Sequence, residues 1–184
     1  MKHIKLILSL ALVIVSIFAI ALPASAATNV SVSWVSAKAK GDLGGVVSCM
    51  YSQMTESSSY IVRAFHEPTT IQVKFDTNKL KWASVKYGSE TGYIPVHHID
   101  ISTDNLRIGM FSSSTLRRGF EGKPVENLQR CLVSLGYDTN GIDGVYGAGT
   151  EDAVTKFQRK YSLLVDGVAG KDTKVKLLSE CDML

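Results

Sequence analysis

A phrase that occurs twice in the last third of the sequence constrains the fold more than any other feature. Its first copy runs from Val125 to Thr150, and its second copy runs from Val154 to Thr173. Each copy joins a helix-spaced apolar run and a Gln-Arg pair to an Asp-Gly turn, followed by a Thr that can cap the next helix. The segment is therefore expected to form two helical units joined by tight turns, with a third helix after the second copy.

The ends of these helices carry recognisable signals. Pro124 is favoured at the start of a helix and Gly136 at its end, so the first helix is expected between them. Thr150 and Thr173 are expected to cap the second and third helices. In each turn, Gly can adopt a positive φ while the Asp side chain bonds nearby backbone amides. Three short amphipathic helices should share one small core.

At these residues the chain resembles the peptidoglycan-binding domains of bacterial cell-wall hydrolases. The resemblance covers Leu116 to Leu178, and we assign the domain to residues 116–184. It implies a three-helix bundle that holds a protein on the wall polymer and has no chemistry of its own. The positions that fill the family pattern are Gly122, Val125, Leu128, Gln129, Leu132, Leu135, Gly136, Tyr137, Asp143, Gly144, Tyr146, Gly147, Thr150, Ala153, Val154, Phe157, Gln158, Leu164, Asp166, Gly167, Gly170, Thr173 and Leu177.

The residues that would touch a ligand are a separate question. A wall glycan or stem peptide offers hydroxyls, amides and carboxylates, so its binder needs exposed polar groups beside an apolar or aromatic platform. In the repeated turns, the best candidates are Asp143, Tyr146, Thr150 and Asp166. The glutamines of the repeat either contact the ligand or bond the backbone across the repeat. These two residues are Gln129 and Gln158.

The first 26 residues have the layout of a secretory signal peptide. Lys2 and Lys5 precede an apolar stretch from Leu6 to Leu22, and Pro23 and the run Ala24-Ser25-Ala26 follow it. The alternative is an uncleaved membrane anchor, because about 17 apolar residues can span a bilayer. The proline and the small-residue site favour cleavage after Ala26. The sequence thus predicts a secreted, cell-wall-associated protein with no stable membrane span after cleavage.

Charge excludes a nucleic-acid partner and composition favours two domains. Without residues 1–26, the charge is 18 − 17 = +1, because two of the 20 Lys and Arg residues and none of the 17 Asp and Glu residues are removed. Such a balance gives no basic field for nucleic acid. About 158 residues remain. Residues 28–104 are rich in β-branched and aromatic side chains, and we interpret the Gly/Ser-flavoured residues 105–115 as a flexible linker.

The N-terminal region resembles a bacterial SH3-like domain. Trp82, Val85, Gly92 and Tyr93 match the W-x-x-V, turn and G-Y pattern with which such domains end. The resemblance implies an all-β SH3-like barrel over residues 28–104. The first half departs from the family, because Cys49-Met50-Tyr51-Ser52 stands where the usual L-N-V-R-x-G-P-S run of such domains would fall. Tyr51, Trp82 and Tyr93 could line a groove and stack on sugar or peptide, or they could form the core of a small barrel.

The three cysteines have readings consistent with export. A Cys131–Cys181 disulfide would close a loop of about 50 residues and could contribute roughly 4 kcal/mol to stability. The alternative is that both remain thiols. Cys49, in the other domain, is either a small buried apolar side chain, a catalytic thiol or half of an intermolecular bridge.

An enzymatic site could be assembled only from scattered residues of the N-terminal region. The candidates for a thiol peptidase or a zinc site are Cys49, His66, Glu67, His97, His98 and Asp100. Adjacent histidines on an extended chain point to opposite faces, so His97 and His98 should not serve one site. No established catalytic motif occurs, and we expect the remaining length to leave no room for a separate catalytic domain. We therefore expect no catalytic residue, no metal and no cofactor.

These observations combine into one prediction with an alternative. The protein is expected to be a secreted, non-catalytic cell-wall protein that binds peptidoglycan, through either glycan strand or stem peptide, by its C-terminal domain. The alternative is a wall-anchored adaptor or regulator, in which the SH3-like domain recruits a cell-wall hydrolase.

Overall fold

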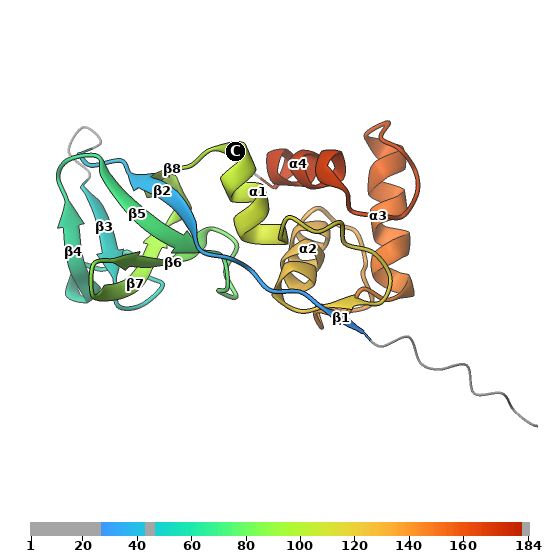
Figure 1. Cartoon of the computed structure of the whole chain (residues 1–184), viewed down its shortest axis with the longest axis horizontal. Helices are drawn as coiled ribbons and strands as arrows, with labels where there is room; N and C mark the ends of the chain where they lie inside the picture. Colours follow the sequence, from blue (N-terminus) through green and yellow to red (C-terminus); the bar gives the residue numbers. More distant parts are fainter. Residues whose placement is uncertain (1–26, 43–46, 182–184) are drawn as a thin grey trace, which may run out of the picture.

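The computed structural model describes residues 27–42 and 47–181, and it divides into a β-rich region and a helical region. Figure 1 shows the sheet at one end of the long axis and helices α2, α3 and α4 at the other. The predicted signal peptide, residues 1–26, lies outside the described residues. Among the residues that are described, no helix has both the length and the apolar character needed to cross a membrane.

The β-rich region is a seven-stranded antiparallel sheet. Its strands pair in the order β4-β3-β7-β6-β5-β2-β8. Side chains alternate between buried and exposed along β2, because successive residues of a strand point to opposite faces. The strands of this sheet are β2 (Val35–Ala39), β3 (Ser48–Tyr51), β4 (Ile61–Phe65), β5 (Thr69–Lys74), β6 (Trp82–Tyr87), β7 (Glu90–Pro95) and β8 (Ile99–Asp100). Two 3-10 helices, η1 (Ser58–Tyr60) and η2 (Val96–His98), connect them.

The expected closed barrel is not confirmed. Within the described residues the sheet is open, since β4 and β8 stand at opposite ends of the strand order. Strand β8 is only two residues long, because a helix begins directly after it. The Ser102 hydroxyl accepts a hydrogen bond from the Asn105 amide at 3.3 Å and so caps that helix. The coarser prediction of an antiparallel β-rich region before a helical one holds.

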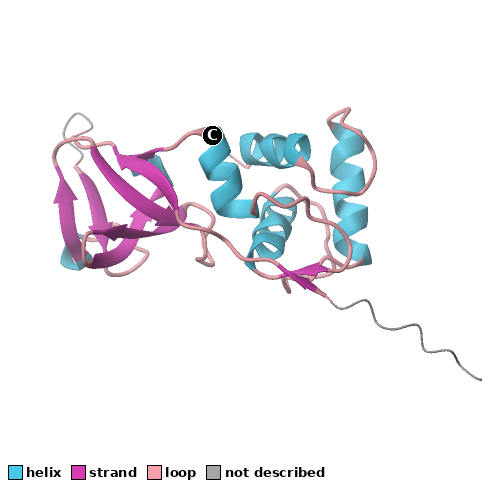
Figure 2. Ribbon diagram, viewed as in Figure 1, coloured by secondary structure: helices cyan, strands magenta, loops and turns pink. Residues whose placement is uncertain are grey.

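Helix α1 (Thr103–Phe111) occupies the segment that composition indicated as a flexible linker. It packs between the sheet and the helices α2 and α4, as Figures 1 and 2 show. Its single glycine allows this packing, because a Cβ at Gly109 would lie 2.9 Å from the Phe75 ring and 3.0 Å from a Val35 methyl. The Gly and Ser content of this segment suggested a flexible linker, but its glycine instead allows a helix to pack closely against the sheet.

The helical region contains the three expected helices, α2 (Lys123–Ser134), α3 (Ala148–Lys160) and α4 (Lys171–Glu180). The first ends where predicted, with Gly136 at φ +85°. The predicted caps are wrong: the N-cap positions of α3 and α4 are Gly147 and Gly170. Thr150 and Thr173 lie inside the first turns, where their hydroxyls accept hydrogen bonds from the glutamines of the repeat.

The start of the described chain belongs with the helical region rather than with the sheet. Strand β1 (Thr28–Asn29) pairs in parallel with β9 (Phe120–Glu121). The Val30 amide adds a hydrogen bond to the Glu121 carbonyl at 2.7 Å. Figure 2 shows this short pair apart from the main sheet. This differs from the expectation that the N-terminal domain begins at residue 28, because residues 30–34 lead from the helical region to β2 of the sheet.

Buried polar side chains tie the two regions together. The Asn127 amide nitrogen, on α2, donates to the carbonyls of Phe75 at 2.8 Å and Met110 at 2.9 Å. The Lys174 ammonium, on α4, donates to the carbonyls of Phe111 at 3.1 Å, of Ser112 at 3.3 Å and of Ser114. Phe111 is the last residue of α1, and Ser112 and Ser114 follow it, so the ammonium binds carbonyls at and just beyond the C-terminus of this helix. One apolar cluster runs through both regions, so they are packed together rather than loosely joined.

Candidate functional site

The first copy of the sequence repeat is a hydrogen-bonded clamp around Gln129. Its side-chain nitrogen donates to Asp143 Oδ1 at 2.8 Å, to the Val145 carbonyl at 3.1 Å and to Thr150 Oγ1 at 3.1 Å. Its side-chain oxygen accepts from the Gly144 amide at 2.8 Å. One glutamine on α2 therefore fixes both the Asp-Gly turn and the first turn of α3.

The second copy repeats this clamp around Gln158. Its nitrogen donates to Asp166 Oδ1 at 2.9 Å, to the Val168 carbonyl at 2.9 Å and to Thr173 Oγ1 at 3.1 Å. Its oxygen accepts from the Gly167 amide at 2.9 Å. Both glutamines are 1% exposed. The sequence left open whether these glutamines contact the ligand or bond the backbone across the repeat. In the structure both form hydrogen bonds with the backbone of the following turn.

The remaining candidates in the turns divide into exposed and buried residues. Asp143 and Asp166 are exposed, and the hydrogen bond from Gln129 lowers the pKa of Asp143 below its usual range. Tyr146 is 1% exposed, and its hydroxyl donates to the Gly167 carbonyl at 2.8 Å, which joins the two Asp-Gly turns. Burial raises the pKa of Tyr146. This tyrosine therefore supports the turns from inside and is not a surface platform.

A groove at the second Asp-Gly turn gathers several of the predicted residues. It has a volume of about 330 Å³ and lies where α3 leads into α4. We call it the α3–α4 groove. Its wall offers the carboxylates of Asp166 and Asp172, the cation of Lys171, and Leu164, which is 79% exposed. The lining residues are Gln158, Ser162, Leu163, Leu164, Asp166, Val168, Gly170, Lys171, Asp172 and Thr173.

Sequence reasoning missed Lys171 and Asp172 as groove residues and gave Leu164 only a place in the motif. The signal for Leu164 was present, since an apolar residue after the end of a helix and next to a turn has no core to enter. The first Asp-Gly turn also has an exposed apolar residue beside it. Ile142 and Val165 precede the two Asp-Gly pairs and are 38% and 45% exposed. The turns therefore combine apolar and carboxylate groups on the surface.

The aromatic candidates of the sheet do not share one groove. Trp82 borders a depression of about 490 Å³ against α2, which also includes Arg130, Val133 and Ile142. Tyr93 borders a different depression of about 450 Å³, with Asp76 and Lys123. The third aromatic, Tyr51, is buried and packs its ring edge against Trp82 at a centroid distance of 5.8 Å. The alternative reading of Tyr51 as a core residue fits this position.

The cysteines of the predicted disulfide lie together as thiols. The Cys181 sulfur is 3.6 Å from the Cys131 carbonyl oxygen, and Cys131 is fully buried. A side-chain hydrogen bond between the two thiols, and then burial, raise the pKa of Cys131. A disulfide between them stays a prediction. Cys49 is buried in β3, where burial raises its pKa, which favours its reading as a small apolar side chain.

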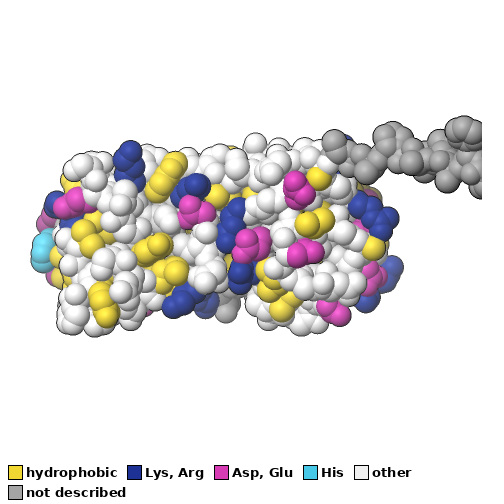
Figure 3. Space-filling model, turned by 90° about the horizontal axis from the view of Figure 1, so that it is seen from below, with side chains coloured by type: hydrophobic (Ala, Val, Ile, Leu, Met, Phe, Trp, Pro, Cys, Tyr) yellow, Lys and Arg dark blue, Asp and Glu magenta, His cyan; other side chains and the backbone are white. Residues whose placement is uncertain are grey.

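Surface charge is mixed on the face shown in Figure 3. Lys and Arg side chains there are interspersed with Asp and Glu along the whole length of the molecule. No field of one sign covers that face. This agrees with the small net charge of the sequence.

Comparison with known proteins assigns the helical region. Residues 121–177 match the family described as a putative peptidoglycan binding domain. A spore cortex-lytic enzyme of Oceanobacillus iheyensis is 41% identical over 76 residues, which are 41% of this chain and 28% of the enzyme. A probable N-acetylmuramoyl-L-alanine amidase of Bacillus licheniformis is 43% identical over 32% of this chain and 18% of its own length. A solved structure, the SleB N-terminal domain, is 42% identical over 39% of this chain and 97% of its own, with a TM-score of 0.38.

These relatives correct the functional prediction from the sequence. The expectation of a non-catalytic attachment protein or an adaptor is contradicted, because the relatives are named as cell-wall hydrolases. The argument relied on chain length and on missing motifs. This chain spans 28% or less of the length of these two enzymes, and the match lies in the binding region, so length carries no such conclusion. Residues 121–177 belong to the peptidoglycan-binding domain family.

Proposed function

We propose that this chain binds peptidoglycan through its helical region, as a substrate-binding module of the cell-wall hydrolase type. The observation that supports this most strongly is the family match over residues 121–177, together with relatives named as a spore cortex-lytic enzyme and an amidase. The match includes both glutamine clamps. Peptidoglycan is thus the polymer on which we propose that the protein acts.

The α3–α4 groove is the surface that we propose for the ligand. Leu164 supplies an exposed apolar platform, Lys171 supplies a cation for a stem-peptide carboxylate, and Asp172 supplies an acceptor for hydroxyls and amides. The Gln158 clamp beside the groove holds the Asp-Gly turn and the start of α4, which carry these side chains. A pre-organised site of this kind loses little conformational entropy on binding.

The residues predicted from the sequence then take two kinds of role in the proposal. Asp143 and Asp166 are exposed enough to meet the ligand directly. The buried members act by holding the turns in shape, and they are Gln129, Tyr146, Thr150 and Gln158. A wall polymer with repeating units could meet both turns, because each copy presents an apolar residue before its Asp-Gly pair.

We further propose that the chain is exported and that its sheet is a divergent SH3-like fold. Export is supported by the charged, apolar and small-residue order of residues 1–26. The SH3-like fold is supported by the β6–β7 hairpin, in which Trp82 faces Pro95 and Val85 faces Gly92 in register. Trp82 and Tyr93 could add contacts to sugar rings at the depressions that they border.

Co-sedimentation of the full chain with purified, insoluble peptidoglycan tests the binding proposal. Leu164→Ser and Lys171→Glu should each lower the bound fraction, and together they should weaken binding about tenfold, which corresponds to a loss of about 1.4 kcal/mol. Val62→Ser and Lys86→Glu make the same changes at exposed positions of the sheet and should leave binding unchanged. Failure of the parent chain to sediment with peptidoglycan would contradict the proposal.

A second measurement addresses chemistry. The same chain is incubated with dye-labelled peptidoglycan, and the release of soluble dye is followed. Release that depends on the chain would extend the proposal from binding to hydrolysis. Binding without release would leave peptidoglycan recognition as the activity of the described residues, so this measurement and the sedimentation assay separate the two parts of the proposal.

A further inference from the structure

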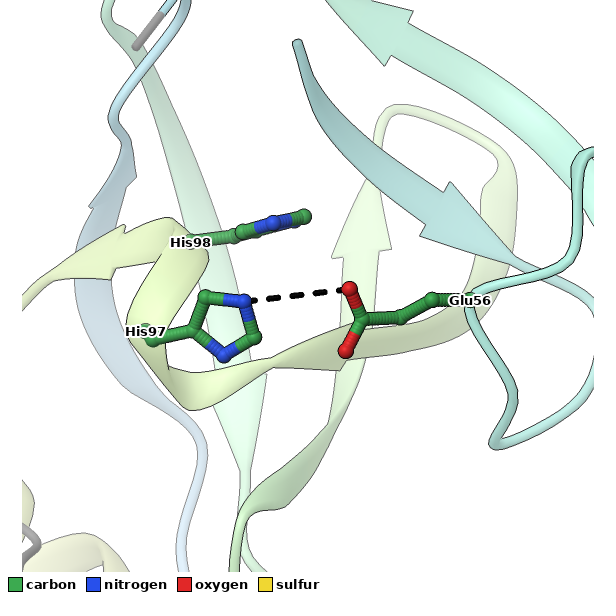
Figure 4. A group of neighbouring side chains, drawn as sticks. All are labelled: Glu56, His97 and His98. Atoms are coloured by element: carbon green, nitrogen blue, oxygen red, sulfur yellow. Dashed lines mark ion pairs between the residues drawn. The ribbon is translucent and has the colours of Figure 1, made fainter. Parts of the chain in front are cut away.

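Three metal-ligating side chains meet beside the sheet, outside the residues that match the peptidoglycan-binding family. They are Glu56, His97 and His98, and one ligand atom of each lies within 4.8 Å of the others. His97 Nε2 is 3.8 Å from Glu56 Oε2. Figure 4 shows the carboxylate reaching toward both imidazoles from the opposite side.

The local backbone explains why the two histidines come together. The sequence argument placed them on an extended chain with opposite orientations, but η2 makes Val96–His98 a turn of 3-10 helix. In a 3-10 turn, successive side chains are rotated by about 120° rather than by 180°. The two rings lie with their centroids 4.4 Å apart and at an angle of 71°. The objection to a shared site therefore does not apply.

His98 provides an independent sign that something is bound here. Its side chain is 1% exposed, yet both ring nitrogens lack a hydrogen-bond partner within the described part of the chain. Leaving a buried donor or acceptor unsatisfied costs about 1–3 kcal/mol, so such groups normally have a partner. A ring nitrogen of a neutral imidazole can bind a metal ion, so a bound ion would satisfy this buried side chain.

We propose that Glu56, His97 and His98 form a binding site for one divalent transition-metal ion, with zinc the best fit. Two imidazoles and one carboxylate are a common zinc ligand set, and they suit zinc better than calcium or magnesium, which prefer oxygen. Ligands about 2.0–2.1 Å from a tetrahedral zinc ion lie about 3.4 Å from each other. The donor atoms, which lie within 4.8 Å of one another, must close by up to about 1.4 Å, which the exposed side chains of Glu56 and His97 can do by rotation.

Two consequences follow from the position of this site. Glu56 comes from the segment between β3 and η1, whereas the histidines follow β7, so a metal ion would fasten that segment to the sheet. Three protein ligands also leave a fourth position for water, and zinc lowers the pKa of such a water to about 7.

The test measures the affinity of the full chain for zinc, by competition with a chromophoric chelator. We expect one zinc ion per chain, and we expect Glu56→Gln and His97→Ala each to weaken it more than about tenfold, since even loss of a partner to a ligand costs about 10–100-fold. Glu67→Gln and His66→Ala make the same changes at exposed residues outside the cluster and should retain the parent affinity. Cys131→Ala should also retain it, which separates this site from one formed by thiols.

A measurement without substitution covers His98, whose replacement could disturb folding. Zinc added to the unaltered chain should shift the imidazole proton signals of His97 and His98 and leave those of His66 in place. The proposal is overturned if the chain binds no zinc, if Glu56→Gln and His97→Ala bind it as the parent does, or if zinc shifts His66 alone. These results are independent of peptidoglycan binding, so the two proposals stand or fail separately.

Discussion

The helical region and the sheet are stabilised over different distances along the chain. In the helical region, each glutamine clamp closes over 8 to 21 residues and appears twice with the same partners. The sheet relies on apolar packing, and at its junction with the helices it depends on Asn127, 52 residues beyond Phe75. Local, repeated polar bonds therefore stabilise the helical region, while hydrogen bonds between distant segments attach the sheet to it.

The largest expected effect breaks the clamp of the helical region. Gln158→Ala removes both sides of the clamp and leaves the buried Gly167 amide and the Thr173 hydroxyl without that partner. At about 1–3 kcal/mol for each buried group, the free energy of unfolding should fall by about 5 kcal/mol. Urea unfolding measures it. Gln129→Ala should cost a similar amount, whereas Gln72→Ala, at an exposed position of β5, should cost less than about 0.5 kcal/mol.

Oxidation would strengthen the same region from a different direction. The positions of Cys131 and Cys181 should allow mild oxidation to form an intramolecular disulfide, seen as a mass loss of two hydrogens. The closed loop of about 50 residues should raise stability by about 4 kcal/mol on the chain-entropy estimate. Cys131→Ser should abolish both changes, and Cys49→Ser should abolish neither. A disulfide that lowers stability would show that the bridge strains α2 and the end of α4.

The tie between α4 and α1 should make stability depend on pH. Burial, together with the charge of Arg107, lowers the pKa of Lys174 to about 8 from its ordinary value of 10.5. Between these values the unfolded chain binds more protons than the folded chain, so the free energy of unfolding should rise with pH. The slope approaches 1.4 kcal/mol per pH unit, or about 2–3 kcal/mol between pH 8 and 10.

Lys174→Met should remove this rise in stability, as measured by urea unfolding at several pH values. The matched control is Lys176→Met, on the same helix but more exposed, which should keep the slope of the parent. The raised pKa values of the Cys49 and Cys131 thiols act in the opposite direction from about pH 9, and that of Tyr146 from about pH 10. The contribution of Lys174 is therefore the difference in slope between the parent and Lys174→Met. Equal slopes in the parent and in Lys174→Met would contradict the buried ammonium.

The smallest of these effects separates the two regions. Asn127→Leu leaves the carbonyls of Phe75 and Met110 without their donor, and stability should fall by about 2 kcal/mol. Because this bond joins sheet, α1 and α2, unfolding of the variant should show two transitions by tryptophan fluorescence and by helical circular dichroism, which coincide in the parent. Asn78→Leu, in an exposed loop, should leave one transition.

Much of the helical region could be predicted from the sequence because its signals are local. The repeat gave three helices, Gly136 gave the end of the first, and the Asp-Gly pairs gave the turns. Thr150 and Thr173 were predicted to cap helices, but their hydroxyls accept hydrogen bonds from Gln129 and Gln158. A Thr near the start of a helix has the same sequence pattern in both cases. The sequence also could not decide whether Gln129 contacts a ligand or bonds the turn, because its partners Asp143 and Thr150 are identified only by the folded structure.

The rest could not be predicted because it depends on long-range contacts. Gly109 resembles a linker glycine in sequence, and only the nearby Phe75 ring shows that it permits close packing. Strand β1 pairs with residues about 90 positions further along, which no local pattern reveals. The pairing of His97 and His98 also depends on the fold. The chain leaves β7 through a 3-10 turn, and this turn places the two side chains together.

The most direct test of the central claim follows backbone amide signals of the full chain by NMR as soluble peptidoglycan fragments are added. If the helical region binds the wall polymer at the α3–α4 groove, signals of residues 162–173 should shift in proportion to occupancy. Those of β4, at the end of the sheet away from the helices in Figure 1, should stay in place. Shifts confined to the sheet, or no shifts at fragment concentrations that saturate insoluble wall, would contradict the account.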